Sequence, residues 1–352
     1  MSSHTQRGVA TLAQLGDFDE ILDARSPAEF ADDHVPGAVS RPVLDNEERI
    51  RVGTLYKQVS PFEAKKLGAA LVAKNIATHL QAHYLDQPKT WRPLVYCWRG
   101  GQRSGAFTHI LREIGWDAHR LEGGYKTWRS HVVASLVSLP DRFRYTVISG
   151  ATGSGKSRLL EALASEGAQV LHLEALAAHK GSLLGALPNQ PQPSQRSFES
   201  ALLAALEGFD PQRPVFVEAE SRRIGAINLP ETLISRIRSA PCLRVEASIE
   251  ARVAFLLQDY AYFLADPAWL LDTITRFQGM QSNDTLARWR SMVDAREFEP
   301  LVRELLEQHY DPLYQRSQSR NYTDYEAAAP LVTDDLSPDA VRALAQRVLA
   351  AE

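Results

Sequence analysis

Cysteine is scarce in this chain, since only Cys97 and Cys242 occur among its 352 residues. Two cysteines are too few for a disulfide framework, and a bridge between them would join positions far apart in the sequence. A protein without disulfides is typical of a reducing compartment. We therefore expect two free thiols in a cytoplasmic protein, rather than a disulfide-stabilised secreted domain.

Long apolar runs are also missing. No stretch approaches the ~18 consecutive apolar residues that a membrane-spanning helix needs. Residues 1–7 lack the apolar core of a signal peptide. Hydrophobic residues make up 44% of the chain and charged residues 23%, as in ordinary globular proteins. At roughly 100–200 residues per domain, the length predicts two domains, and we expect no membrane partner.

The chain has little excess charge, with a net of −4, but the charge is uneven. Residues 1–140 carry 17 basic and 15 acidic side chains, whereas the rest carry 22 and 28. Residues 89–131 carry eight basic and three acidic side chains, interleaved with Trp91, Trp98, Trp116 and Trp128. Such a stretch is suited to binding phosphates and stacking on bases. It is also typical of a solvated rim above core tryptophans, and composition alone favours this simpler interpretation.

Short apolar runs alternate with segments of helical spacing along the chain. The first part has predicted strands at 18–23, 93–97 and 119–121, and predicted helices at 103–114 and 125–137. After Pro140 the alternation restarts, with strands at 145–149, 168–173, 215–217 and 243–245, helices at 156–164 and 230–239, a proline-rich loop at 188–195, and a mostly helical stretch at 248–310 broken near Pro267 and Ser282. Helices between strands favour parallel sheets, so we expect an α/β protein.

The first chemical motif is Gly150-Ala151-Thr152-Gly153-Ser154-Gly155-Lys156-Ser157, which fits the phosphate-binding loop G-x-x-x-x-G-K-[ST]. It follows a predicted strand and precedes a predicted helix, as the mechanism requires. Glycines let backbone N–H groups turn inward around an anion, and the helix N-terminus adds partial positive charge. Lys156 would then reach terminal phosphates and Ser157 would offer a ligand to Mg²⁺. We assign no other metal ligands.

A P-loop predicts a polyphosphate site, and an acid at the end of a second strand usually completes it. The run Val215-Phe216-Val217-Glu218-Ala219-Glu220 offers Glu218 or Glu220 in that role, although either would also serve as a solvated strand end. Arg222 and Arg223 follow at once. They are candidates for bidentate binding of a second anion, or plain surface charge.

The second motif is Cys97-Trp98-Arg99-Gly100-Gly101-Gln102-Arg103, between a predicted strand and a predicted helix. Loop amides, the helix N-terminus, Arg99 and Arg103 would all favour an anion at the centre of this loop, and hence the nucleophilic thiolate. Because Cys97 ends its strand and Gly100 and Gly101 open the backbone beside it, we predict a reactive Cys97. Cys242 lies inside an apolar run and is predicted to be a core residue.

These residues resemble a rhodanese domain over roughly 10–138. The resemblance is carried, in order, by Asp23-Ala24-Arg25-Ser26-Pro27-Ala28-Glu29-Phe30, His34-Val35-Pro36-Gly37-Ala38, the Cys97 loop, Leu121-Glu122-Gly123-Gly124-Tyr125 and Trp128. Rhodaneses carry sulfur as a persulfide on the loop cysteine. Here five residues, not the common four, separate Cys97 from Arg103. This spacing resembles that of dual-specificity phosphatases, but Tyr96 stands where those enzymes have histidine. A wider loop would suit a larger anion.

A rhodanese domain followed by a P-loop domain is an unusual pair, and residues 141–352 form the predicted second domain, with a helical C-terminal region. Together with Gly53-Thr54-Leu55-Tyr56-Lys57-Gln58 and Glu218-Ala219-Glu220-Ser221-Arg222-Arg223-Ile224-Gly225, the whole chain is similar to the tRNA 2-selenouridine synthase family. The resemblance implies an enzyme that acts on the thiolated wobble uridine in the tRNA anticodon. Its co-substrates would be geranyl diphosphate, which alkylates the sulfur, and selenophosphate, whose selenium then replaces it. A protein that supplies selenophosphate is a further implied partner.

The resemblance also implies roles for the motif residues. Geranyl diphosphate would lie in the 150–157 loop, with Lys156 stabilising the departing diphosphate, while Cys97 would carry or deliver selenium with Arg99 and Arg103 holding the anion. The basic 89–131 stretch, Arg222 and Arg223 would face tRNA phosphates. Two other functions stay open at this point. One is an ATP-dependent sulfurtransferase or kinase, and the other is a non-catalytic tRNA- or protein-binding module.

Overall fold

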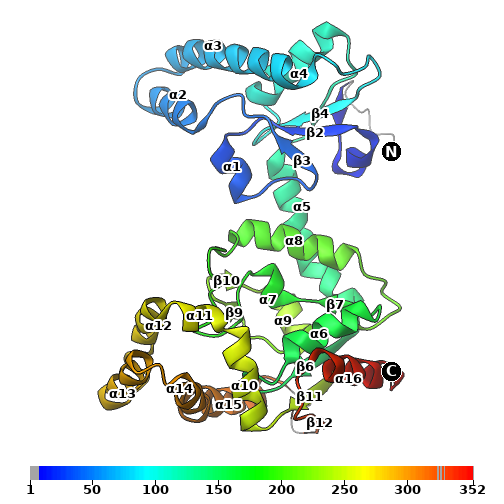
Figure 1. The fold of residues 1–352 in the computed structure, drawn as a ribbon. Coiled ribbons are helices and arrows are strands. Elements are labelled where there is room, and N and C mark those ends of the chain that lie inside the picture. The colour runs from blue at the N-terminus through cyan, green and yellow to red at the C-terminus, as the bar shows by residue number, and fades with distance from the viewer. Residues whose placement is uncertain (1–7, 323–324, 326, 329, 352) are drawn as a thin grey trace. The chain divides into compact units, whose positions relative to one another are not determined.

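The computed structural model describes residues 8–322, 325, 327–328 and 330–351. The first seven residues, for which we expect no signal peptide, lie outside this set. The chain divides into two compact units, Met1–Ala134 and Ser135–Glu352 (Figure 1). Each unit is built on its own five-stranded sheet, and each is described here by itself.

The first unit is an α/β layer structure. Its strands are β1 (Val9–Ala10), β2 (Glu20–Asp23), β3 (Ala38–Ser40), β4 (Pro93–Tyr96) and β5 (His119–Leu121). Its helices are η1 (Leu12–Asp17), α1 (Pro27–Asp32), α2 (Asn46–Gln58), α3 (Pro61–His79), η2 (Leu80–Tyr84), α4 (Gln102–Ile114) and α5 (Tyr125–Ser138), the last of which runs on into the second unit. The strand order is β1-β5-β4-β2-β3, and every pairing is parallel.

This topology places the cysteine loop at the carboxyl edge of the first sheet. β4 is the central strand and is buried throughout, and α4 follows directly after the loop. In Figure 1, α3 and α4 lie on one side of the sheet and α1 and α5 on the other. The core on the α3 and α4 side includes Ile76, Val95, Phe107 and Leu111. Because parallel strands carry ligands beyond their carboxyl ends, this edge is where chemistry is expected.

The second unit repeats the parallel design. Its strands are β6 (Tyr145–Ser149), β7 (Gln169–Leu171), β8 (Val215–Glu218), β9 (Arg223–Ile224), β10 (Ile227–Asn228), β11 (Cys242–Glu246) and β12 (Pro330–Val332). The helices and single turns around the sheet are η3 (Leu139–Arg142), α6 (Lys156–Ser165), α7 (Leu173–Leu176), α8 (Gln195–Glu207), α9 (Glu231–Arg238) and α16 (Pro338–Ala350). The sheet has the order β12-β11-β6-β8-β7 with parallel pairing, while β9 and β10 form a separate antiparallel hairpin.

Helices α6 and α16 bury one face of the second sheet. Leu160 and Leu163 of α6 pack with Leu344 and Val348 of α16 against the strands. The central strand β6 leads straight into α6, so the turn between them, residues 150–155, lies at the carboxyl edge of this sheet. The parallel sheets and the helical region after β11 confirm the predicted α/β class.

A helical region is inserted between β11 and β12. It comprises α10 (Ile249–Asp259), α11 (Ala261–Ala265), α12 (Pro267–Ile274), η4 (Thr275–Phe277), α13 (Asn283–Asp294), α14 (Phe298–Leu305), η5 (Leu306–Tyr310) and α15 (Asp311–Asn321). It has a core of its own around the fully buried Trp289 and Phe277. New helices begin at Pro267 and directly after Ser282, which confirms the two predicted breaks. The Ser282 hydroxyl accepts from Thr285 N. Among the described residues, no helix combines the length and apolar character that crossing a membrane requires.

Several predicted element boundaries differ from the structure by one or two residues, and for two of them the structure shows the cause. The strand expected at 168–173 ends at Leu171, because the buried Glu218 carboxylate accepts from Glu174 N at 2.6 Å and holds the chain in the first turn of α7. The loop expected at 188–195 ends one residue early, because Ser194 caps α8 through its hydroxyl. Both differences come from polar side chains at helix starts rather than from apolar periodicity.

Candidate functional site

Cys97 lies immediately after β4, at the start of the loop that leads into α4. Its side chain is only 3% exposed and belongs to the core cluster, which differs from the open thiol that the adjacent glycines suggested. The Sγ atom lies 3.2 Å from Ser104 Oγ, on the first turn of α4. The Cys97 side chain is thus packed against the core, and its thiol lies beside one hydroxyl.

The two glycines after β5 allow a close approach to this loop. Gly124 has a φ of +62°, and a Cβ there would lie 2.2 Å from the Cys97 carbonyl oxygen and 2.5 Å from Gly100 N. The same carbonyl accepts from Tyr125 N at 2.9 Å. Any larger residue at position 124 would clash with the backbone of the Cys97 loop and would be strained at this positive φ, so glycine is required there.

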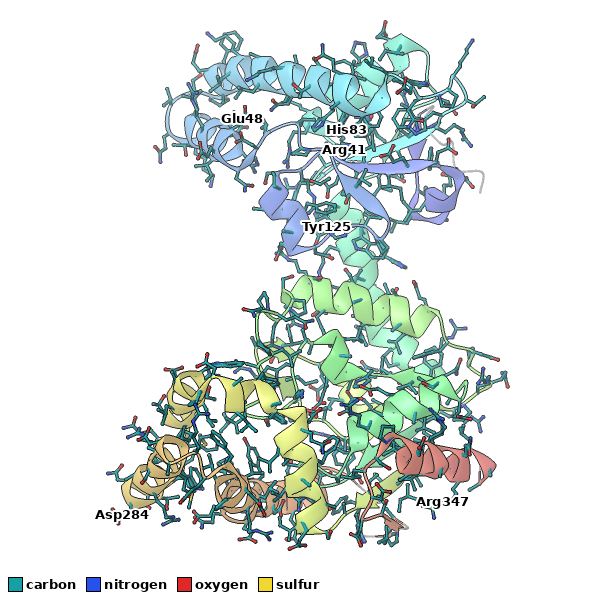
Figure 2. The ribbon with its side chains drawn as sticks, in the orientation of Figure 1. Arg41, Glu48, His83, Tyr125, Asp284 and Arg347 are labelled. Carbon is teal, nitrogen blue, oxygen red and sulfur yellow. The ribbon has the colours of Figure 1, made fainter. Side chains whose placement is uncertain are left out.

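A buried ion pair supports the loop from the side of β2. Arg25 and Asp23 are almost fully buried, and the guanidinium binds both carboxylate oxygens, with a shortest distance of 2.6 Å. The guanidinium carbon lies 3.9 Å from the centre of the Tyr125 ring, and the Tyr125 hydroxyl donates to Asp33 Oδ2 at 2.7 Å (Tyr125 is labelled in Figure 2). These motif residues fix the shape of the sheet edge and do not point to a ligand.

Arg99 and Arg103 have different surroundings. Arg103 binds both carboxylate oxygens of Glu29, at 2.6 and 3.3 Å. Burial opposes ionisation of Glu29, but this arginine outweighs it and lowers the pKa of Glu29 to about 2. Arg103 is therefore engaged in an ion pair, whereas Arg99 is exposed and forms no hydrogen bond or ion pair with the described residues.

The basic 89–131 stretch does not form one free cationic surface. Arg92 pairs with Asp117 at 3.1 Å, and Arg112 donates to the carbonyls of Ala118 and Gly8. Trp91 and Trp128 are core residues, at 4% and 6% exposure. Of the cationic side chains in the Cys97 loop, Arg99 is thus the one that is exposed and forms no ion pair with the described residues.

The P-loop has the backbone that its glycines predict. Gly150, Gly153 and Gly155 have φ values of +150°, +81° and +86°. A Cβ at Gly150 would lie 2.5 Å from Ser154 Oγ and 2.6 Å from Val245 O, so no larger residue fits there. The amide of Gly150 donates to the Tyr314 hydroxyl at 2.6 Å, which ties the loop to α15.

Lys156 folds back over the loop. Its Nζ donates to Gly150 O at 2.6 Å and to Ala151 O at 3.4 Å, and it lies 5.4 Å from the centre of the Tyr314 ring. Burial lowers the pKa of Lys156, and the carboxyls of Glu174 and Glu220 oppose that shift. The ammonium therefore lies where the loop encloses an anion, and it gains from any negative charge that enters.

Three carboxyls surround this lysine. Glu174 accepts from the Ser157 hydroxyl at 2.9 Å and shares a hydrogen bond with Glu220. Both approach Gly181, where a Cβ would meet Glu220 Oε1 at 2.7 Å and Glu174 Oε1 at 2.8 Å. Burial and the neighbouring carboxylates raise the pKa of Glu174, and raise that of Glu220 well above its usual value. Both carboxyls therefore ionise less readily than an exposed glutamate does.

Glu218 has a structural contact and a free oxygen. Its Oε1 accepts from Glu174 N and lies 3.3 Å from His172 Nδ1. Its Oε2 is buried without a hydrogen-bond partner among the described residues. Arg222 lies just before the β9–β10 hairpin and Arg223 lies in β9, and both are away from the P-loop. Arg222 pairs with Glu231 at 2.6 Å on the surface, so the structure does not bring it into the phosphate site.

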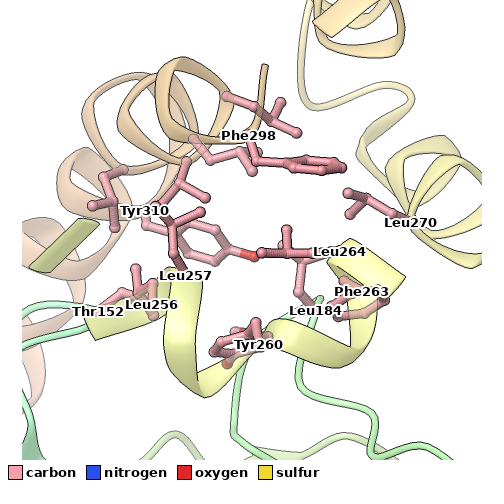
Figure 3. Close-up of a pocket in the computed structure, with 15 residues that line it drawn as sticks. Thr152, Leu184, Leu256, Leu257, Tyr260, Phe263, Leu264, Leu270, Phe298 and Tyr310 are labelled. Carbon is pink, nitrogen blue, oxygen red and sulfur yellow. The ribbon is translucent and has the colours of Figure 1, made fainter. Parts of the chain in front are cut away.

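Two cavities meet at the P-loop. The larger, the P-loop cavity, has a volume of about 690 Å³ and is lined by Lys156, Ser157, Glu174 and Glu220 among others. The second, the apolar cavity, lies among α10, α11, α12 and α14 (Figure 3). Its lining is nearly all hydrocarbon and aromatic: Leu256, Leu257, Tyr260, Phe263, Leu264, Leu270, Phe298, Leu301, Val302, Leu305, Leu306 and Tyr310, with Leu184, Ser182 and Thr152. Because Thr152 and Tyr260 line both cavities, a polyphosphate site adjoins an apolar one.

Sequence reasoning missed most of this second site. Glu174, Tyr314 and the apolar lining carry no motif of their own, since their role comes from where the helical region packs. Ser104, which faces Cys97, and Glu29, which engages Arg103, were inside or near motifs, but only the fold shows their contacts.

The Glu29–Arg103 pair predicts a pH-dependent stability. Because the folded pKa of Glu29 lies below its ordinary 4.5, its contribution is present above pH 4.5 and is lost as the pH falls towards 2. Glu29→Gln should lower the free energy of unfolding by about 1–2 kcal/mol at pH 7, discounted for partial exposure. Urea unfolding should show this gap narrowing between pH 4.5 and 2. The exposed Glu122→Gln is the control, and an equal, pH-independent loss in both variants would contradict the assignment.

Comparison with known proteins agrees with the two-unit organisation. Residues 8–131 match the family described as rhodanese-like domain. Residues 143–281 match the family described as tRNA 2-selenouridine synthase AAA domain. The first match covers the Cys97 loop, and the second covers the P-loop, the carboxyl cluster and the first part of the helical region.

Full-length relatives carry the same description. A tRNA 2-selenouridine synthase of Nitrosomonas europaea is 38% identical over 247 residues, which are 68% of this chain and 63% of that protein. Those of Shewanella halifaxensis and Marinobacter nauticus are 32% and 33% identical, over 84% of this chain and 87% of each relative. The chain therefore spans slightly less than two thirds of the first relative and most of the other two. Because these two relatives are more than 30% identical over most of both chains, this chain belongs to the tRNA 2-selenouridine synthase family of enzymes.

Proposed function

We propose that this enzyme converts 2-thiouridine at the wobble position of tRNA into 2-selenouridine in two steps. The first is S-geranylation from geranyl diphosphate, and the second is replacement of the geranylated sulfur by selenium from selenophosphate. The observation that carries the first step is the junction of a P-loop with an apolar cavity, since a prenyl diphosphate has these two parts. Alkylation helps the second step, because it turns a poor thiocarbonyl leaving group into a thiol.

The P-loop suits a diphosphate leaving group. Backbone amides and Lys156 lie at the start of α6, where the helix dipole favours negative charge. When the C–O bond of the prenyl donor breaks, charge builds on the diphosphate, and a buried ammonium stabilises it more strongly than water would. Because the pKa values of Glu174 and Glu220 are raised, these carboxyls ionise less readily and would repel a diphosphate less than exposed carboxylates would.

The apolar cavity suits a prenyl chain. It opens beside Thr152 of the P-loop, so a chain bound there leaves its first carbon next to the diphosphate. The free space is narrow, about 60 Å³, so a ten-carbon chain would require the surrounding leucine side chains to shift. A nucleotide base would find few hydrogen-bonding partners in such a lining, which favours a prenyl donor over ATP.

A Mg²⁺ ion fits this site as a partner of the diphosphate. The described residues contain no group of three His, Cys, Asp or Glu side chains arranged around a metal. However, Mg²⁺ is commonly held by one or two protein ligands together with substrate phosphates and water. Ser157 and Glu174, joined at 2.9 Å, are the residues that would hold it. When bound, the ion would add to the charge stabilisation of the diphosphate.

The Cys97 loop is our candidate for the selenium step. Cys97 would carry or deliver the selenium of selenophosphate, and the exposed Arg99 is the cation best placed to attract the anion. Arg103, engaged by Glu29, would act by holding α1 and α4 together beside the loop. The tRNA anticodon would be held partly by phosphate contacts, so binding should weaken as salt rises.

Cys97→Ala should abolish selenium incorporation and leave geranylation within about twofold of the wild type. The readout is mass spectrometry of thiolated anticodon RNA incubated with each donor separately. Cys242→Ala is the matched control, since Cys242 is the other buried cysteine and lies in β11. Equal loss of both steps in a folded Cys97→Ala protein would contradict the division of labour.

Lys156→Ala should impair geranylation and leave selenium incorporation intact. Removing a charge that faces the leaving group costs about 10²–10³ in rate in comparable sites, so geranylation should fall by that factor. RNA that has been geranylated beforehand should still be converted to the selenium product. Unimpaired geranylation, or hydrolysis of ATP by the wild type without a prenyl donor, would show that the loop serves another ligand.

Leu264→Trp should shorten the prenyl chain that is accepted. Each buried methylene contributes about 0.8 kcal/mol, so excluding one five-carbon unit should weaken binding of geranyl diphosphate on the order of a thousandfold. Binding of the five-carbon dimethylallyl diphosphate should change little. A uniform loss for both donors would mean that the chain does not enter this cavity.

A further inference from the structure

Three histidines line the P-loop cavity, and two of them are already engaged. His172 pairs with Glu218, whose Oε1 lies 3.3 Å from His172 Nδ1. Burial lowers the pKa of His172, but this pairing outweighs burial and raises that pKa. His309 Nδ1 lies 3.3 Å from Gln281 Nε2, which holds its ring. His179 differs, because neither of its ring nitrogens hydrogen-bonds to any described residue.

The ring of His179 is fixed by packing instead. It is 8% exposed, and two glycines make room for it. A Cβ at Gly185 would lie 2.8 Å from His179 Nδ1, and a Cβ at Gly225 would lie 2.9 Å from Cδ2. A buried polar ring that the protein positions but does not satisfy is arranged for a ligand, since buried polar groups are otherwise paired.

His179 also joins two cavities. It lines the P-loop cavity together with Lys156, and it lines a neighbouring cavity of about 750 Å³. We call this second space the side cavity; its polar lining includes Asn189, Gln190, Arg223 and Arg276. Its size is in the range of small-molecule sites, and its amides and guanidinium groups suit a nucleobase with its flanking phosphates.

We propose that the side cavity holds the 2-thiouracil base and that His179 accepts its N3 proton during prenyl transfer. This inference rests on the proposed function. His179, Gly181 and Ser182 line both the side cavity and the P-loop cavity, so a base in the side cavity would adjoin a donor whose diphosphate is held at Lys156.

The step balances without another reactant. A sulfur lone pair forms the bond to C1 of the geranyl group, and the C1–O bond breaks with its electron pair going to the diphosphate. The N3–H bond electrons become the C2=N3 double bond as the C2=S double bond becomes single, and the N3 proton moves to His179. The imidazolium then releases this proton to water. Removing the proton increases the negative charge on sulfur, and hence its nucleophilicity.

The charges around the ring keep it neutral and ready to accept. The charged groups of the segments that pack near it are Arg223, Arg276, Lys180, Asp259, Glu174 and Glu220. Burial lowers the pKa of His179, and the charge of Arg276 lowers it further. Lys180 is neutralised by Asp259 at 2.6 Å, and Glu174 and Glu220 face Gly181 rather than the imidazole.

The test compares geranylation rates of wild type, His179→Gln and His179→Ala across pH, with thiolated anticodon RNA and geranyl diphosphate. At pH 7 we expect each variant to be 10²–10⁴-fold slower, the usual worth of a general base. The deficit should shrink as rising pH removes the N3 proton without help. Added imidazole should raise the rate of His179→Ala, because the missing ring leaves a matching space.

The outcomes separate this inference from the proposed function. If the wild type forms no geranylated RNA, the proposed function itself fails. If it does, and thermal unfolding shows that His179→Gln is folded, a deficit that stays constant with pH and ignores imidazole would overturn the role of His179. His309→Gln is the matched control, since it alters a second buried histidine of the same cavity. Any deficit there should not depend on pH or imidazole.

Discussion

The guanidinium of Arg252 fixes the relation between the helical region and the phosphate loop. It donates to Thr152 O at 2.8 Å and binds both carboxylate oxygens of Asp311, at 2.9 and 2.6 Å. Arg252 is 6% exposed, so this ion pair is largely shielded from water and demands good geometry. Through it, α10 and the start of α15 are tied to the loop after β6. The apolar cavity borders the P-loop because of this contact.

The same site holds more negative than positive charge in its interior. Lys156 faces Glu174, Glu218 and Glu220, and burial favours the neutral forms of Lys156, Glu174 and Glu220. Glu174 and Glu220 share a hydrogen bond, Glu218 caps α7, and the lysine binds loop carbonyls. An incoming diphosphate would therefore replace the contacts of Lys156 with neutral carbonyls by a stronger ionic contact, which favours anion binding at this site.

The sequence predicted the parts of the fold that depend on local pattern. The alternation of apolar runs and helical spacing located β4, α4, β6 and α6, and Gly115 ends α4 in the left-handed conformation that its residue type allows. The glycines of residues 150–155 have the backbone that the motif implies. The β7 end was misplaced because Glu218, 47 positions from Leu171, pulls the chain into α7, and no local pattern reports such a contact.

The sequence by itself determined the α/β class, the two motif loops and the family, because these rest on residue type and spacing. Tertiary structure alone decided which motif residues are free to act. In the folded chain Arg103 pairs with Glu29, the Cys97 side chain is buried, and Arg222 pairs with Glu231 away from the phosphate site. It also assembled the apolar cavity and left the ring of His179 without a partner among the described residues. The physical reason is that charge pairing and burial depend on neighbours that are distant in sequence, and only the packed chain brings those neighbours together.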